Sequence, residues 1–289
     1  MNEQVLRLNY SPCPNDTFIF YGLASGLVPL PGFRLDISLA DVEVLNVRAA
    51  RGEADVCKVS FAAAAGLLDD WLLLRAGGAM GRGVGPLLVA REGVEPRDLN
   101  GKAVAIPGSR TTANLLFGLY CRELGLELER MEMVFDQIMP AVARGEVAAG
   151  VVIHEGRFTY AEHGLSRLAD LGRWWEERRG LPIPLGVIAV RRALGPGTAR
   201  LVQDAIRRSL DLARGEARTS AGTSARKGAG PPWRFCPRLG QGRCPSRCSW
   251  ATRPCGGPGS GTRPRGPARR RRTGRARAVR PAWPSRGRG

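Results

Sequence analysis

The chain contains two histidines, and His154 stands where a side chain could act on a bound molecule. It directly follows the apolar run of residues 151–153, which predicts a buried strand. α/β folds present ligand-facing side chains at the carboxyl ends of such strands, and an imidazole titrates near neutral pH. His154 is therefore a candidate general base, and the alternative is a structural histidine that caps the edge of a sheet. His163 lies in a polar run and is expected in a solvated loop.

Further polar side chains stand at the junctions between apolar strands and helices. Lys58 ends a buried strand, an unusual place for a lysine, and could pair there with a carboxylate. Ser60 begins the helical run that follows, and Thr111 and Thr112 begin a helix in the other half of the chain. Ordinary helix capping is the alternative for each hydroxyl. Asn46 has no distinctive spacing and predicts only a residue on the surface of a helix.

Three segments that lead from an apolar strand into a helix must position these groups. They are residues 11–20, which read SPCPNDTFIF, residues 56–60 and residues 103–112. In the first segment two prolines fix the loop, and Asn15 or Asp16 is the expected N-cap of the next helix. A helix that begins after such a loop directs free N–H groups and the positive end of its dipole at one place. The three loops together predict one cleft for a small molecule that carries a carboxylate.

Strands and helices alternate along the chain, which predicts an α/β fold with a largely parallel sheet. The chain is expected to pass between two lobes twice, near residues 86–91 and 184–191, and ligands of such folds bind between the lobes. The predicted domains are lobe 1, residues 1–90 and 186–216, and lobe 2, residues 91–185. The predicted strands are 5–8, 34–38, 54–59, 72–76, 85–90, 103–106, 131–135, 149–153 and 185–191, and the predicted helices are 18–24, 42–51, 60–68, 113–124, 138–144 and 198–213.

The glycine-rich segment 77–85 resembles a phosphate-binding loop, but a strand follows it where a helix is required. A flexible loop beside the cleft is the preferred interpretation. Residues 1–216 show no metal-ligand spacing and no Ser-His-Asp signature, so the sequence predicts no metal site. Trp174 and Trp175 are expected to pack a lobe surface or a cleft wall.

The basic residues are distributed unevenly. Of the 44 Lys and Arg, 19 lie in residues 217–289, which contain no Asp or Glu. Residues 1–216 therefore hold 25 basic and 26 acidic side chains, a net charge of −1, although the whole chain carries +18. A nucleic-acid-binding function would rest on the tail alone, so no specific nucleic-acid partner is expected.

Residues 217–289 lack apolar periodicity and are expected to be disordered. A reading-frame shift in GC-rich DNA is the preferred explanation, because the dominant residues have GC-rich codons. The second explanation is a basic arm that binds polyanions non-specifically. The third is a zinc site, for which the spacing is poor because no C-x₂-C pair occurs. Its four cysteines would be Cys236, Cys244, Cys248 and Cys255.

The amino-terminal residues lack a basic segment followed by an apolar core, and no apolar run is long enough to span a membrane. The sequence therefore predicts a cytoplasmic protein without a membrane partner. Cys13, Cys57 and Cys121 have no redox or metal spacing and read as isolated thiols.

Three separated motifs resemble the 1,4-dihydroxy-6-naphthoate synthase family of the futalosine route to menaquinone. They are SPCPNDTF at residues 11–18, GGAMGRGVGP at 77–86 and IHEGRFTY at 153–160, within a match over roughly residues 5–213. The resemblance implies a periplasmic-binding-protein-like fold that works as an enzyme without a cofactor. It implies a carbon–carbon lyase that converts cyclic dehypoxanthinyl futalosine to 1,4-dihydroxy-6-naphthoate and releases a three-carbon fragment.

The same resemblance places the family's catalytic base on His154. Its substrate-binding segments fall on Lys58, Val59 and Ser60, on Thr111, Thr112 and Ala113, and on Asn46. The alternatives are a chorismate dehydratase of the same pathway and fold, and a non-catalytic protein that clamps an anion. The family continues with helices that pack on the first lobe, whereas this chain continues with the basic tail.

Overall fold

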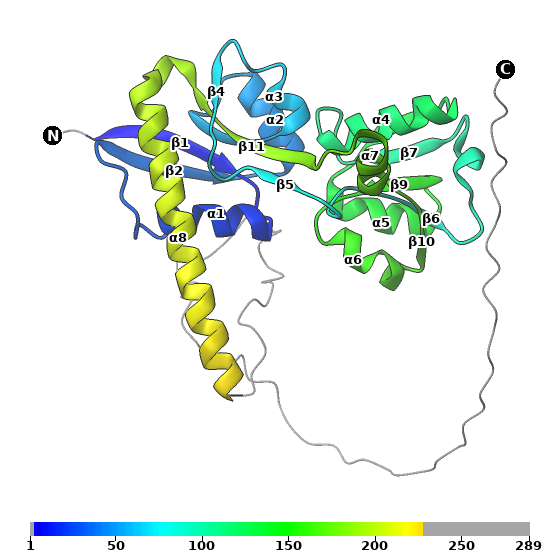
Figure 1. Ribbon diagram of the computed structural model, residues 1–289. Helices are drawn as coiled ribbons and strands as arrows, with labels where there is room; N and C mark the ends of the chain where they lie inside the picture. Colours follow the sequence, from blue (N-terminus) through cyan, green and yellow to red (C-terminus); the bar gives the residue numbers. More distant parts are fainter. Residues whose placement is uncertain (1–2, 228–289) are drawn as a thin grey trace, which may run out of the picture. The chain divides into compact units, whose positions relative to one another are not determined.

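The computed structural model describes the backbone of residues 3–227 and the side chains up to residue 216 (Figure 1). The backbone in this range forms two sheets. The first sheet has the order β2-β1-β3-β11-β4, with β5 paired to β11, and the second has the order β10-β6-β9-β7-β8. The first-sheet strands are β1 (Gln4–Tyr10), β2 (Phe33–Leu39), β3 (Val56–Ser60), β4 (Trp71–Leu73), β5 (Ala79–Gly81) and β11 (Ile183–Arg191). The second-sheet strands are β6 (Leu87–Arg91), β7 (Ala103–Ile106), β8 (Glu129–Glu132), β9 (Ala149–Val152) and β10 (Leu165–Asp170).

Both sheets are mixed, although alternation of strands and helices predicted a largely parallel sheet. β1 runs parallel to β2 and β3, whereas β11 runs antiparallel to β3, β4 and β5. In the second sheet β7 is parallel to β8 and β9, whereas β6 is antiparallel to β9 and β10. The antiparallel strands β6 and β11 are the ones that enter their sheet from the other lobe. Such strands follow no β–α–β crossover, so nothing forces them to run parallel.

The crossings lie a few residues away from the predicted domain boundaries. β6 pairs within the second sheet, so the first crossing ends before Leu87, whereas the sequence placed residues up to 90 in lobe 1. β11 is paired with the first sheet from Ile183 onward, whereas the sequence began the return at residue 186. Each crossing strand belongs wholly to the sheet that it enters.

Each sheet is covered by helices on both faces (Figure 1). Leu6, Leu8 and Tyr10 alternate along β1 and enter the core beneath α1 and α8, whereas Cys57 and Val59 of β3 enter the core beneath α2 and α3. In the second lobe α4 and α7 cover one face and α5 covers the other. The α-helices are α1 (Pro14–Ala24), α2 (Val42–Ala50), α3 (Phe61–Ala64), α4 (Thr112–Leu124), α5 (Phe135–Arg144), α6 (Gly156–Thr159), α7 (Leu171–Arg179) and α8 (Gly195–Lys227). Short 3₁₀ helices are η1 (Pro96–Leu99), η2 (Tyr160–His163) and η3 (Arg192–Leu194).

Two helix starts differ from the sequence prediction. Helix α1 begins at Pro14, with Cys13 as an N-cap whose side chain makes no capping bond. The predicted caps Asn15 and Asp16 lie inside the helix, because proline is already suited to the first helical position and has no N–H to satisfy. Ser60 precedes the short helix α3 but does not cap it with its hydroxyl.

Helix α8 continues to Lys227, past the predicted start of the tail at residue 217. No proline occurs between Pro196 and Pro231, and Ala, Arg and Lys are strong helix formers. Residues 228–289 lie outside the described part of the chain. The predictions for them, including the alternative zinc site of four cysteines, are therefore not examined by the structure.

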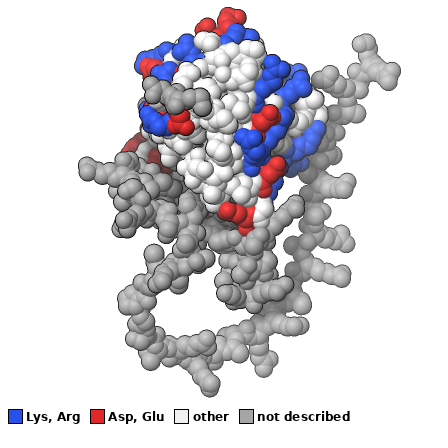
Figure 2. Space-filling model, turned by 90° about the vertical axis from the view of Figure 1, so that its left-hand side faces the viewer, with Lys and Arg blue, Asp and Glu red and all other residues white. Residues whose placement is uncertain are grey.

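Charged side chains on the face shown in Figure 2 gather in separate groups around a broad uncharged area. In these groups Arg and Lys lie beside Asp and Glu. Within residues 3–227, no helix has the length and apolar character needed to cross a membrane.

Candidate functional site

Lys58 and Asp16 form a buried ion pair at the start of α1. Alternation along β3 directs Lys58 to the same face as Val56, which is the face covered by α1. Lys58 Nζ lies 2.5 Å from Asp16 Oδ1, and both side chains are less than a tenth exposed. Ser11 donates to Asp16 Oδ2 through its backbone N–H and its hydroxyl, at 3.2 and 2.7 Å. The carboxylate predicted to pair with Lys58 is thus supplied by the protein itself.

Asn46 is buried and bound to Ser60, which corrects its interpretation as a surface residue. Ser60 N–H donates to Asn46 Oδ1 at 2.9 Å, and Asn46 Nδ2 donates to Ser60 Oγ at 3.1 Å. Asn46 is fully buried and Ser60 is 3 % exposed. Two reciprocal hydrogen bonds fix the serine hydroxyl between α2 and the end of β3. Spacing missed this because a helix as short as α2 shows little periodicity, and packing decides which face is buried.

Thr111 caps α4, as one of the two sequence interpretations holds. Its Oγ1 accepts from Asn114 N–H at 3.1 Å and donates to the Gly108 carbonyl at 2.8 Å. Ala113 and Val59 point into the cores of their own lobes. These two residues can meet a ligand only through their backbone groups.

Thr112 joins the two lobes. Ala62 N–H of α3 donates to Thr112 Oγ1 at 3.2 Å, and Thr112 Oγ1 donates to the Leu185 carbonyl of β11 at 3.1 Å. Its hydroxyl is therefore engaged within the protein, and a ligand at this place must replace one of these bonds.

His154 follows β9 with φ 53°, the one non-glycine residue of the described chain with a positive φ. This left-handed conformation is strained for a residue with a side chain, and it turns the chain sharply into α6. The imidazole is half-buried and packs edge-to-face on Phe135, with ring centres 5.4 Å apart. No side chain of the described residues makes a hydrogen bond to its ring. The ring is left available for another partner.

Charges from the first lobe act on the His154 imidazole. Burial lowers its pKa from 6.5, while Glu155, Asp16 and Asp41 oppose this shift and Lys58 adds to it. Because desolvation dominates, the neutral imidazole is favoured near neutral pH. A neutral imidazole can accept a proton.

Asp41, the N-cap of α2, interacts with the charge of His154 and was missed by the sequence prediction. Its Oδ1 accepts from Glu43 N–H at 2.9 Å and caps α2, whereas its Oδ2 is buried without a hydrogen-bond partner among the residues that the structure describes. Burial raises the pKa of Asp41, and the charge of His154 opposes the shift. An acidic residue just before a helix suggests only a cap, so no sequence signal could have singled it out.

Arg157 anchors the short helix that follows His154. Its guanidinium donates to the Gly85 carbonyl at 2.5 Å and to Asp170 Oδ2 at 2.6 Å. Burial raises the pKa of Asp170, but the bond and charge of Arg157 and the N–H groups of Arg173 and Gly172 together outweigh it, so the pKa is lowered. The segment carrying His154 is thereby tied to the crossing between the lobes.

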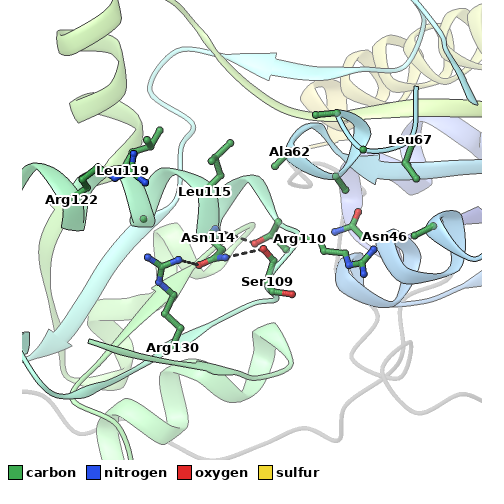
Figure 3. A pocket seen from close by; sticks show the side chains of 16 residues that line it. Asn46, Ala62, Leu67, Ser109, Arg110, Asn114, Leu115, Leu119, Arg122 and Arg130 are labelled. Carbon is green, nitrogen blue, oxygen red and sulfur yellow. Dashed lines mark hydrogen bonds between the residues drawn. The ribbon is translucent and has the colours of Figure 1, made fainter. Parts of the chain in front are cut away.

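A groove of about 620 Å³ lies between α2 and α3 on one side and α4 on the other. Figure 3 shows Asn46 on one side of it and Ser109, Arg110 and Asn114 on the other. The groove reaches Asn46 and Thr111 but not His154. The candidate site therefore extends beyond the groove. It runs from Asn46 and Thr111, which line the groove, to His154, which does not. No group of three potential metal ligands occurs in the part of the chain that the structure describes.

Comparison with known proteins agrees with this fold. A sequence profile of the family described as menaquinone biosynthesis matches residues 6–235. A solved structure of an Archaeoglobus fulgidus protein superposes with a TM-score of 0.69 at 36% identity, covering 78% of this chain and 83% of that chain. An alkanesulfonate-binding protein from Xanthomonas axonopodis superposes with a TM-score of 0.59 at 18% identity, covering 80% and 82%.

The fold is thus the two-lobed, periplasmic-binding-protein-like fold, and the chain belongs to the menaquinone biosynthesis family. Within that family, it is 50% identical over 210 residues to a 1,4-dihydroxy-6-naphthoate synthase of Thermus thermophilus, covering 73% of this chain and 75% of the relative. It is also 50% identical over 216 residues to the synthase of that name from Streptomyces coelicolor, covering 74% and 75%. The resemblance predicted from the three motifs is confirmed, and these relatives favour it over the chorismate dehydratase alternative.

Proposed function

We propose that the chain is a carbon–carbon lyase that converts cyclic dehypoxanthinyl futalosine to 1,4-dihydroxy-6-naphthoate and releases a three-carbon fragment. The observation that carries this proposal is the placement of His154. Its imidazole has no hydrogen bond to the described residues at the end of β9, and the charges of Asp16, Asp41 and Lys58 act on it from the first lobe. The similarity to two synthases supplies the substrate.

In this proposal the first lobe binds most of the substrate, and the second lobe carries the catalytic base His154. The Ser60 hydroxyl is held by Asn46, so it meets a ligand in one fixed orientation. Lys58 supplies positive charge, and Asp16 holds its ammonium group in place. The start of α4 at Thr111 and Thr112 supplies N–H groups and the positive end of the helix dipole for a substrate carboxylate. Val59 and Ala113 are the sequence neighbours of these residues, and they take part through their backbone groups.

The proposed reaction begins when neutral His154 takes a proton from the bound substrate. The electron pair left behind drives cleavage of the carbon–carbon bond, and the imidazolium returns a proton to the departing fragment or the product. Burial assists this role because it keeps the imidazole unprotonated before the substrate binds. The strained backbone holds the ring in one direction, which lowers the entropy cost of reaching the transition state.

The test is turnover by the purified full chain, followed by chromatography with mass detection of the naphthoate product. We expect product from cyclic dehypoxanthinyl futalosine and none from chorismate. Turnover of chorismate alone would assign the dehydratase reaction. Tight binding of the futalosine without product would assign an anion-binding clamp.

A further inference from the structure

Glu43, in the first turn of α2, is a carboxylate of the first lobe that is bound by a loop of the second. Arg110 N–H donates to both of its oxygens at 3.2 Å. The Ser109 hydroxyl lies 3.5 Å from Oε1. Asn46 Nδ2 donates to Oε2 at 3.2 Å, so the same carboxylate also contacts the residue that orients Ser60.

The loop before α4 is shaped to receive this carboxylate. Gly108 has φ 143°, and a Cβ there would lie 2.4 Å from Glu43 Oε2 and 2.5 Å from its Cβ and Cγ. A side chain at position 108 would therefore prevent the approach of Glu43. The N–H group of Arg110, just before α4, binds a carboxylate of the other lobe, whereas the N–H groups of the first turn of α4 are the ones assigned to the substrate.

The surroundings of Glu43 raise the pKa of its carboxyl group. Burial raises its pKa, the hydrogen bonds from Asn46 and Arg110 oppose the shift, and Glu132 adds to it. Glu132 contacts the same loop from the second lobe, because Ser109 N–H donates to its Oε1 at 3.2 Å. Two carboxylates thus bind one loop, and only Glu43 reaches across from the other lobe.

We propose that Glu43 is a positioning residue that fastens the first lobe to the loop before α4 and aligns the Asn46–Ser60 pair with Thr111 in one binding surface. It acts on the substrate through Asn46 and the loop, and it takes no part in proton transfer. This inference rests on the proposed function only for its kinetic readout. The arrangement of the lobes is a second readout that needs no turnover.

The experiment compares Glu43→Ala, Glu43→Asp and Glu43→Gln in the full chain, with Glu132→Ala as the matched control. The distance between the lobes is measured by pulsed electron resonance between labels at exposed Leu68 and Leu124. The labels are attached through non-natural amino acids, because the chain contains seven cysteines. The values of kcat and KM are measured in parallel.

For Glu43→Ala and Glu43→Asp we expect a longer and broader distance distribution and a KM raised about 10- to 100-fold, with a smaller change in kcat. Aspartate is one methylene too short to reach the loop. Glu43→Gln keeps an oxygen that accepts from Arg110, so it should retain most of the wild-type behaviour. Glu132→Ala should leave the distance unchanged and KM within about 2-fold.

An unchanged distance distribution in both Glu43→Ala and Glu43→Asp would overturn the proposal. An equal effect of Glu132→Ala would also overturn it. The effect would then come from disturbing the loop before α4 and not from losing the contact of Glu43 between the lobes. If the wild-type chain has no lyase activity, the proposed function fails, and the distance measurement still decides the role of Glu43.

Discussion

The two sides of the candidate site differ in how their polar groups are held. On the first lobe, Asp16, Asn46, Lys58 and Ser60 are all at most 6 % exposed, and each has a hydrogen-bond partner. On the second lobe, His154 is half-buried, strained in its backbone and without a hydrogen bond to its ring from the described residues. The first arrangement suits recognition, because its groups are oriented before a ligand arrives. The second suits reaction, because the ring is not already committed to a partner.

Replacing His154 should have the largest effect on activity. It should remove the reactive group of the second lobe and leave the binding groups of the first lobe unchanged. Asparagine is the chosen substitute, because it tolerates the left-handed backbone at φ 53° better than alanine does. We expect His154→Asn to lower kcat about 10²- to 10⁴-fold, with little change in substrate binding. Steady-state kinetics and isothermal titration calorimetry measure the two effects. The matched control, His163→Asn, should keep wild-type kcat, and full turnover by His154→Asn would remove His154 from the mechanism.

Breaking the ion pair of the first lobe should mainly cost stability. Lys58→Met leaves Asp16 as an uncompensated buried charge, so the free energy of unfolding should fall by about 3–5 kcal/mol. Urea unfolding measures it. The exposed pair Arg207–Asp204 is the control, since Asp204→Asn should change stability by less than about 1 kcal/mol. Equal losses in the two variants would show that burial does not distinguish these pairs.

Removing the Asn46 amide should have an intermediate effect. Asn46→Ala leaves Ser60 N–H without its buried acceptor, which costs about 1–3 kcal/mol of unfolding free energy. KM should rise as well, because the Ser60 hydroxyl loses its orientation. Asn114→Ala removes an amide that is half-buried on α4, and it should cost less. A KM unchanged by Asn46→Ala would place Ser60 outside the binding surface.

The pH dependence should show the smallest effect. The pKa of His154 is lowered by burial, so the acid limb of kcat/KM in the free enzyme should lie below pH 6.5. The unfolded chain takes up this proton first as the pH falls, so His154 should reduce stability between pH 6.5 and its own lower pKa. His154→Asn should abolish that part of the pH dependence of unfolding. An acid limb above pH 6.5 would contradict the dominance of burial.

Local sequence signals predicted much of the fold but not its pairings. Alternating apolar runs located most strands and the helix starting at Thr112, whereas composition placed the start of the tail at residue 217, inside helix α8. The antiparallel direction of β11 is set by a return from the other lobe, which no local pattern encodes. The missed helix start at Pro14 was a local signal, because proline is favoured at the first helical position.

The candidate site was predictable where a residue type is unusual for its place. Lys58 at the end of a buried strand and His154 after another strand are such cases. Glu43 and Asp41 are ordinary acidic residues at the start of a helix, so neither the hydrogen bond of Glu43 to the second lobe nor the charge interaction of Asp41 with His154 has a counterpart in the sequence. Asn46 was misplaced for the same reason. Its partner Ser60 is distant in sequence and is brought near only by packing.

The position of β11 has a consequence for the order in which the protein forms during synthesis. β11 lies between β3 and β4. Until residues 183–191 have left the ribosome, β3 therefore lacks its partner on one edge, and β4 cannot join the sheet. The second sheet, in contrast, is made of residues 87–170 in one continuous stretch. The second lobe can therefore complete its sheet before the first lobe does. During that time β3 is an edge strand without its partner β11. Pairings between residues distant in sequence form slowly, so chaperones that protect strand edges should bind the nascent chain during this interval.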